Sequence, residues 1–414
     1  MSMLPRLFVS MCLVCGAAYP DLLLRDVNVV DVAGGTVLPK RSVLIRGAKI
    51  AIVGTAIPEP KDVRIIDAAG KFVIPGLWDM HVHLKEKEQL SMFVAHGITG
   101  VRDMGSDFGI VKEWRDGVQR GVLTGPHIET SGAAFDGFPA DDPRLPVKVV
   151  RDPYEARSGF DHVDDEGVDF ISVFPRLPRD AYFALAERAR KYYSFVSGPV
   201  PASVSLLEAI DARQKTIDRM SGVLLACSTE ERKLRPIRSL ALERRDWEGF
   251  RLAEVAALNS FSEEKAHALF RRMALYETRS VPMLVALDSS RPASAFYDTL
   301  VRLLMWMHQD GVSVLAGTDA GQGTLHSGET LHRELELMVA AGFTPAEALR
   351  SATLDPAKYL DATESLGSVE QGRLADLVLL DANPLSDIRN TRRIAAVVLG
   401  GRYIPEIRKQ TATK

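Results

Sequence analysis

Two histidines and one aspartate are the residues of this sequence best suited to bind a metal ion. The segment PGLWDMHVHL carries His81 and His83 at the end of a short apolar run that is typical of a β-strand. Side chains two residues apart on a strand share a face, so both imidazoles could contact one ion. The segment LAGTDAG places Asp319 between glycines, just past a second predicted strand at residues 312–316. Its carboxylate could bind the same ion and accept a proton from bound water.

Each of these groups also has an ordinary structural interpretation. The HxH pair could be two half-buried histidines, and Asp319 could cap the start of a helix. Two further histidines are candidates for a missing ligand or for a substrate contact. His127 follows a proline near the end of a candidate strand, and His326 lies on the loop after Asp319. The alternative for both is an exposed loop histidine.

The elements around these residues predict an α/β fold. From residue 75 to residue 363, short apolar strands such as ITGVRDM and VDFISVF alternate with helical stretches such as DAYFALAERARKYY. This alternation and length are typical of a (β/α)8 barrel, in which active-site residues lie at the carboxyl ends of the strands. The charged stretch at residues 228–251 mixes both signs and predicts a solvated helix, or alternatively a lid.

Both ends of the chain differ from this middle part in composition, because they are rich in β-branched residues and in glycines that favour turns. LLLRDVNVVDV and SVLIRGAKIAIVG lie near the start, and ADLVLLDANP and RIAAVVLGGRYI near the end. Short runs of this kind read as strands and hairpins. We therefore expect residues 20–74 and 364–410 to form one composite β-sandwich domain beside the barrel domain at 75–363.

Composition excludes several classes of protein. The chain has 414 residues, of which 46% are hydrophobic and 25% charged, and its net charge is −3. It carries no basic field for nucleic acid, and three cysteines build no disulfide framework. Beyond the N-terminus no apolar run reaches about 18 residues, so we expect no membrane span.

The N-terminal segment is a candidate signal peptide. In residues 1–19, Arg6 precedes a short apolar run and a small-residue segment, GAA, where a peptidase could cut. Cleavage would make the protein secreted or periplasmic, and would remove the CxxC pair Cys12 and Cys15. An uncleaved extension would leave the protein in the cytoplasm.

These motifs together resemble the amidohydrolase superfamily, in its branch of imidazolonepropionase-like and Xaa-Pro-dipeptidase-like hydrolases. The resemblance covers nearly everything after the leader, including VIPGLWDMHVHL, GITGVRDMG, LHRELELMVAAGFTPAEALRSATLDPAKYL and GSVEQGRLADLVLLDANPLSDI. It implies a (β/α)8 barrel, a composite sandwich, and hydrolysis of an amide-like bond by metal-activated water. His81, His83 and Asp319 match three of the family's six metal ligands.

The sequence departs from this family at the other three ligand positions. Where relatives carry a carboxylated lysine on strand four, VDFISVF has Ser172. The segment SFVSGPVP has Pro199 and TIDRMSG has Arg219 at the positions of two histidines. Neither proline nor arginine offers a side-chain ligand for a metal ion. A two-metal site is therefore not expected.

We expect a hydrolase of amide or peptide-type C–N bonds with one divalent metal, zinc being the first candidate and iron another. Asp319 would act as the base, on a small-molecule or short-peptide substrate. The alternative is a catalytically silent relative that binds a small molecule or partner, and a third possibility is metal-free, non-hydrolytic chemistry. Arg219 would pair with Asp319 or with a carboxylate of the ligand. A homo-oligomer is expected only from its frequency among soluble proteins.

Overall fold

The computed structural model describes residues 20–57, 59–290 and 295–405 of the chain. The predicted leader and residues 406–410 of the predicted sandwich lie outside these ranges. The described residues form two compact units. The helical unit comprises residues 103–112 and 129–315, and the sheet unit comprises residues 20–102, 113–128 and 316–405. No helix among the described residues is long and apolar enough to cross a membrane.

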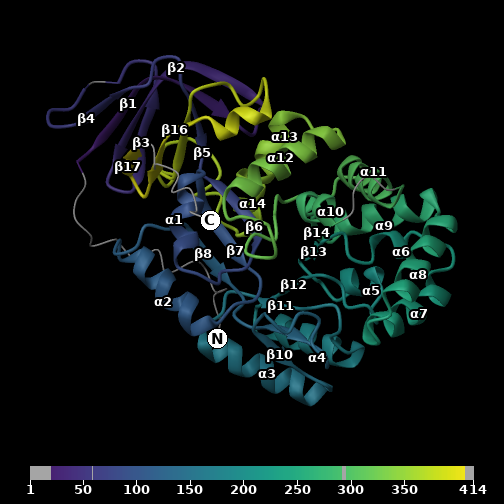
Figure 1. Ribbon diagram of the computed structural model, residues 1–414. Helices are drawn as coiled ribbons and strands as arrows, with labels where there is room; N and C mark the ends of the chain where they lie inside the picture. Colours follow the sequence, from purple (N-terminus) through teal and green to yellow (C-terminus); the bar gives the residue numbers. More distant parts are fainter. Residues whose placement is uncertain (1–19, 58, 291–294, 406–414) are drawn as a thin grey trace. The chain divides into compact units, whose positions relative to one another are not determined.

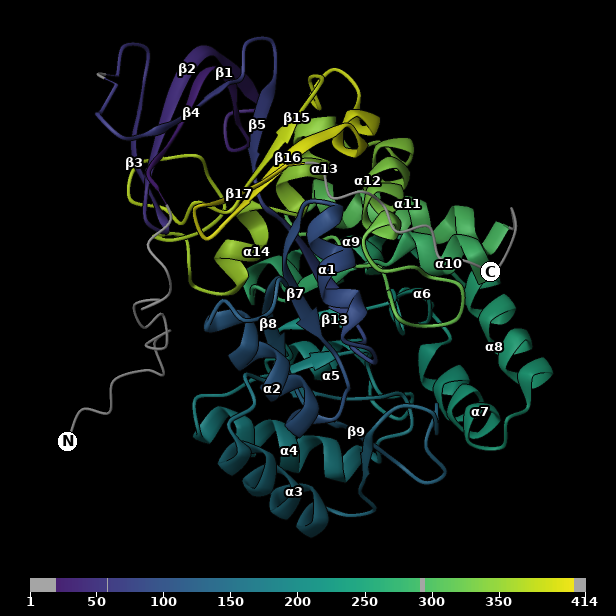
Figure 2. The same cartoon turned by 60° about the vertical axis from the view of Figure 1, so that its left-hand side comes forward.

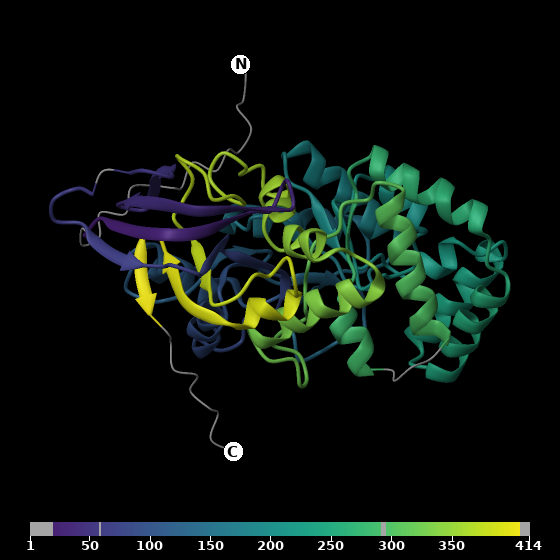
Figure 3. The same ribbon diagram turned by 90° about the horizontal axis from the view of Figure 1, so that it is seen from above.

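The main sheet of the sheet unit is built from both ends of the chain. Its hydrogen-bonded order is β17-β16-β15-β5-β1-β2-β3, with β4 paired to β1. The join between the two ends is the antiparallel pairing of β5 with β15. The purple N-terminal strands and the yellow C-terminal strands accordingly lie side by side (Figures 1 and 3). The strands are β1 (Leu22–Asp31), β2 (Thr36–Arg46), β3 (Lys49–Gly54), β4 (Arg64–Asp67), β5 (Phe72–Pro75), β15 (Leu377–Leu380), β16 (Ile394–Leu399) and β17 (Arg402–Pro405).

Apolar side chains from both ends share one core on this sheet. Leu22, Leu24 and Val43 of the N-terminal strands are buried in the same cluster as Leu377 and Val398 of the C-terminal strands. A fully buried side chain of this size stabilises the fold by about 1.5–3 kcal/mol. Both ends of the chain therefore contribute strands to one sheet.

A second sheet, with most of its residues in this unit, has the order β6-β7-β8. Every residue of β6 and β7 is buried, as in strands that are covered on both faces. Residues 316–320 run beside β6, with a parallel bridge between Val82 and Ala320. The strands are β6 (Leu77–Val82), β7 (Ile98–Asp103) and β8 (His127–Thr130). The helices lying wholly or mostly in the sheet unit are α1 (Glu88–Ala95), α2 (Phe108–Gln119), α12 (Glu329–Ala341), α13 (Pro345–Ser351), α14 (Leu354–Tyr359) and the 3-10 helix η1 (Ile388–Arg392).

The helical unit contains the parallel sheet β11-β12-β13-β14, whose strands alternate with helices. The pairs α3–α4 and α7–α8 each pack side by side (Figure 2). The strands are β9 (Ala134–Asp136), β10 (Val147–Val149), β11 (Ile171–Ser172), β12 (Val196–Gly198), β13 (Thr216–Asp218) and β14 (Arg279–Val281). The helices are α3 (Pro153–Glu166), α4 (Arg179–Lys191), α5 (Leu206–Asp211), α6 (Val223–Ala226), α7 (Glu231–Glu243), α8 (Trp247–Asn259), α9 (Glu263–Leu275), α10 (Leu284–Ser290) and α11 (Ala295–Gln309).

Two local predictions need correction. The expected strand at 312–316 is reduced to a single parallel bridge between Val314 and Ser280, in which Ser280 donates its N–H to the Ser313 carbonyl and accepts the N–H of Leu315. The charged stretch at 228–251 forms parts of two helices rather than one. The break falls where Arg245 has a left-handed φ of +57° and the Asp246 side chain caps α8 by accepting a hydrogen bond from the Gly249 N–H.

Candidate metal centre

Three side chains meet in the sheet unit: the imidazoles of His81 and His83 and the carboxylate of Asp319. All three residues are 2% exposed. Asp319 Oδ1 lies 3.5 Å from His81 Nε2 and 3.3 Å from His83 Nε2. One ligand atom from each residue lies within 4.8 Å of the other two, so all three could face a single ion.

These separations suit donors of one cation. Ligands about 2.0–2.1 Å from a tetrahedral ion lie about 3.3–3.4 Å from one another. Both imidazole-to-carboxylate distances fall close to that value. Two imidazole nitrogens and one carboxylate oxygen are also a donor set that zinc and iron accept in sites with three protein ligands. The residues present therefore fit a single divalent metal ion.

Backbone pairing fixes the two segments that carry these groups. His81 lies on β6 and His83 directly follows it, so their side chains emerge from the same face. The N–H of Asp319 donates to the carbonyl of His81 at 2.8 Å, and the N–H of His83 donates to the carbonyl of Ala320 at 2.8 Å. Gly321 is required here because a Cβ at its position would lie 2.1 Å from the His83 carbonyl oxygen.

A buried carboxylate lies on the same face of β6, two residues before His81. Asp79 Oδ1 accepts a hydrogen bond from the Thr318 N–H at 3.1 Å, and Oδ2 accepts one from the Thr318 hydroxyl at 2.6 Å. Burial raises the pKa of Asp79 to about 7, against the lowering effect of these bonds and of the Arg102 charge. Sequence reasoning missed Asp79 and Thr318. Side chains two residues apart on a strand share a face, so the rule that paired His81 with His83 also places Asp79 beside them. This rule could have identified Asp79 from the sequence.

The structure does not bring His127 or His326 into this group. His127 Nε2 instead lies 2.7 Å from Oδ2 of Asp376, whose other oxygen accepts a hydrogen bond from the Gly400 N–H. His326 is exposed, and its carbonyl oxygen accepts a hydrogen bond from the Thr330 hydroxyl. The group of three is therefore made of the HxH pair and Asp319.

The three residues that we expect at replaced ligand positions lie in the helical unit. Ser172, on β11, is completely buried and donates its hydroxyl hydrogen to the Met104 carbonyl oxygen at 3.0 Å. Pro199 follows β12 and is buried. Arg219 follows β13 and is exposed. The surrounding protein lowers the pKa of its guanidinium, against the opposing effect of three carboxylates, those of Asp141, Asp218 and Asp142.

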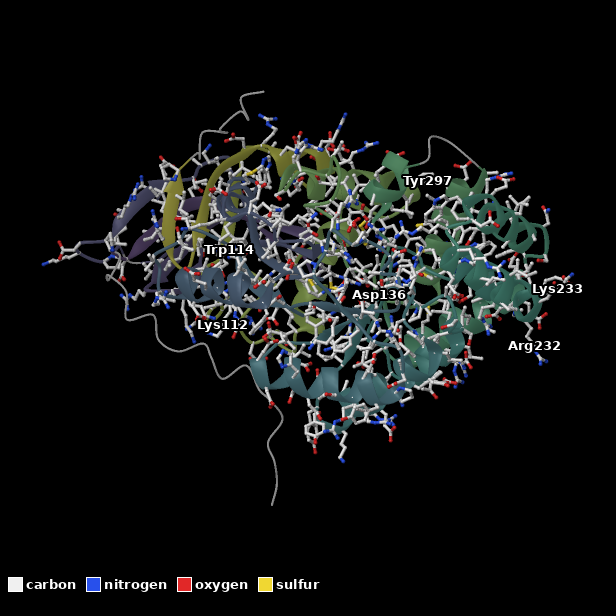
Figure 4. All side chains as sticks on the ribbon, turned by 60° about the horizontal axis from the view of Figure 1, so that its bottom comes forward. Lys112, Trp114, Asp136, Arg232, Lys233 and Tyr297 are labelled. Atoms are coloured by element: carbon white, nitrogen blue, oxygen red, sulfur yellow. The ribbon has the colours of Figure 1, made fainter. Side chains whose placement is uncertain are left out.

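Another cluster of charges in the helical unit surrounds the loop after β9. Asp136, at the end of β9, is buried and accepts hydrogen bonds from the N–H groups of Asp141 and Arg176. The Arg176 guanidinium donates to the carbonyls of Pro139 and Leu242. Figure 4 labels Asp136 among the side chains near the middle of the view, whereas Arg232 and Lys233 project from α7 at its edge. This cluster ties the loop to the end of α7, and we assign it a structural role.

Comparison with known proteins agrees with this fold. The sequence matches the amidohydrolase family over residues 297–404. An adenine deaminase of Rubrobacter xylanophilus is 26% identical over 93% of this chain and 58% of its own length. The structure of a Xaa-Pro dipeptidase with bound methionine superposes with a TM-score of 0.72 at 22% identity, over 93% of this chain and 100% of the other. A putative prolidase from Bifidobacterium longum gives 0.70 at 23% identity, over 94% and 95%.

Residues 297–404 thus match the amidohydrolase family, and the fold of the chain is similar to that of solved amidohydrolase structures. The chain spans a little over half the length of the adenine deaminase that it matches. The resemblance stated from the motifs is confirmed by this family match and by the likeness of the fold.

Proposed function

We propose that this protein hydrolyses amide or peptide-type C–N bonds with the help of a single divalent metal ion, zinc being the first candidate. The observation that carries the proposal is the buried convergence of two imidazoles and one carboxylate in a superfamily of hydrolases. The names of two relatives, an adenine deaminase and a Xaa-Pro dipeptidase, both denote reactions at carbon–nitrogen bonds. We infer a small molecule or short peptide as the substrate.

His81 and His83 would hold the ion through Nε2, and Asp319 would face it through Oδ1. When bound, the ion would supply Lewis-acid polarisation of the scissile carbonyl and lower the pKa of the attacking water. Asp319 would take the proton from that water and pass it to the departing nitrogen. Burial of all three groups excludes bulk water and strengthens their electrostatic effect on the reacting atoms.

We also propose that residues 75–363 form a (β/α)8 barrel, with the chain ends forming the sandwich predicted from the sequence. Support comes from parallel links inside each unit. In the helical unit, β11 to β14 pair in parallel and Ser280 bridges Val314. In the sheet unit, Val82 bridges Ala320 in parallel. The likeness to amidohydrolase structures supports the same architecture.

The alternative function is binding without catalysis. It is favoured by the replaced ligand positions, because Ser172 already uses its hydroxyl on Met104 and Pro199 has no ligand atom. A silent relative would bind its small molecule or partner without hydrolysing it.

Metal analysis separates the two functions. The protein is purified, supplied with zinc, manganese or cobalt, and its bound metal is measured alongside hydrolysis of a panel of dipeptides and N-acyl amino acids. We expect roughly one ion per chain, lost in His81→Ala and in Asp319→Asn but kept in His326→Ala. A native protein that takes up no metal and hydrolyses nothing would overturn the hydrolytic proposal and favour the silent one.

A further inference from the structure

The carboxylate of Asp79 and the backbone and hydroxyl of Thr318 form a two-point contact beside the candidate metal ligands. The Thr318 N–H donates to Oδ1 at 3.1 Å and its hydroxyl donates to Oδ2 at 2.6 Å. Both residues are completely buried. We propose that this pair positions Asp319 for metal binding, an inference that rests on the proposed function of the same site.

The pair joins the two segments that carry the ligands. Asp79 belongs to β6 and shares a face with His81, whereas Thr318 directly precedes Asp319. The Asp79 carboxylate also accepts the His81 N–H at 3.3 Å, so it contacts the backbone of one ligand and the neighbour of another. A shift of Thr318 relative to Asp79 would therefore move Asp319 relative to the imidazoles.

The Thr318 hydroxyl also contacts the residue that follows Asp319 in the sequence. The same oxygen accepts a hydrogen bond from the Ala320 N–H at 3.0 Å, which closes a local turn around Asp319. Asp319 itself has a left-handed φ of +66°. A non-glycine residue in this conformation costs about 1 kcal/mol or more and persists only where its surroundings hold it. The hydroxyl of Thr318 supplies that restraint and at the same time ties the turn to Asp79.

The positioning role of Thr318 depends on its hydroxyl group and not on its methyl group. Serine keeps the oxygen and both of its hydrogen bonds, whereas valine keeps the shape and loses both. Groups that orient metal ligands typically change metal affinity 10–100-fold when removed. Thr278 is a matched control in the helical unit, because it is buried and its hydroxyl donates to the Gln214 carbonyl at 3.0 Å.

The test measures metal affinity in full-length protein. Zinc and cobalt affinities are determined by calorimetry and chelator competition for the native chain and for Thr318→Val, Thr318→Ser, Asp79→Asn and Thr278→Val. We expect about a 10-fold or greater loss in Thr318→Val and Asp79→Asn, and about native affinity in Thr318→Ser and Thr278→Val. The visible spectrum of the cobalt form should change in the first two variants and remain native in the last two.

The increase in melting temperature on adding metal separates positioning from stability. A purely structural role would lower the melting temperature with and without metal by the same amount, whereas loss of positioning reduces the increase itself. Equal metal affinity in native protein and Asp79→Asn would overturn the inference, and this variant decides the case if Thr318→Val does not fold. Loss of affinity in Thr318→Ser equal to that in Asp79→Asn would also overturn it. A native chain that binds no metal would instead overturn the proposed function.

Discussion

His127 Nε2 lies 2.7 Å from Oδ2 of Asp376, and this pairing gives the imidazole a pH-dependent contribution to stability. Burial alone would lower the pKa of His127, but the charge and hydrogen bond of Asp376 outweigh it, so the pKa is raised above its ordinary 6.5. The folded state therefore holds this proton more tightly than the unfolded state. The contribution is fully present below about pH 6.5 and is lost as the pH rises through the folded-state pKa.

The first prediction concerns this pair. The free energy of unfolding of the native chain minus that of His127→Gln should be larger at pH 5.5 than at pH 8.5. The imidazole is 40% exposed, so solvent screening keeps the change below about 1 kcal/mol. Urea unfolding across this range provides the measurement. His162→Gln, which removes an exposed histidine 3.6 Å from Glu166, should show a smaller change with pH. A difference that is constant with pH would contradict the prediction.

The second prediction concerns the buried carboxyl group of Asp136. Burial raises its pKa to about 6, so between about pH 4 and 6 the folded state keeps a proton that the unfolded state has lost. The protonated Asp136 carboxyl group therefore contributes to the free energy of unfolding at pH 4. This contribution falls as the pH rises, by up to about 3 kcal/mol. Asp136→Asn should remove this slope in urea unfolding. Asp165→Asn, on the exposed face of α3, should leave the slope unchanged.

The third prediction is that Ser172→Lys will not create a two-metal site. Ser172 is completely buried, so a lysine there would bury an amine and break the hydrogen bond to Met104. We expect a lower melting temperature and no more bound metal per chain than in the native protein. Metal analysis and calorimetry test both points, with Ser172→Ala as the variant that loses only the hydroxyl. A large gain in hydrolysis would mean that Pro199 and Arg219 are not the replaced ligand positions.

The fourth prediction concerns Arg219. Its guanidinium offsets the charges of Asp141, Asp142 and the buried Asp218, so its removal leaves these carboxylates less compensated. Arg219→Ala should therefore lower the melting temperature by more than Arg232→Ala does. Arg232→Ala, which removes an exposed cation from α7 (Figure 4), should lower it by less than one or two degrees. If differential scanning calorimetry gives the same melting temperature for both variants, this compensating role is wrong.

Short-range sequence patterns were enough to predict that His81, His83 and Asp319 lie together, because each is marked by its immediate neighbours in the sequence. Two histidines two residues apart share a strand face whatever the rest of the fold does. A glycine-flanked Asp319 after an apolar run marks the end of a buried segment. Resemblance over several motifs added the superfamily, which no single motif establishes.

The partners of the polar residues were not predictable in this way. Thr318 and Asp79 are separated by 239 positions, and Asp376 and His127 by 249, so only the folded chain brings each pair together. The strand expected at 312–316 failed for a related reason. An apolar run predicts burial, but its pairing is decided by the neighbouring segment, which here forms one bridge, between Ser280 and Val314.

The pairing of β5 with β15 has a consequence for how the protein is made. The register joins Pro75 to Leu377, so β5 leaves the ribosome about 300 residues before its partner. At 5–20 residues per second this interval lasts roughly 15–60 s. During that time β5 has an unpaired edge that another nascent chain could occupy. Slow synthesis of the C-terminal half would prolong the time for which this edge stays unpaired.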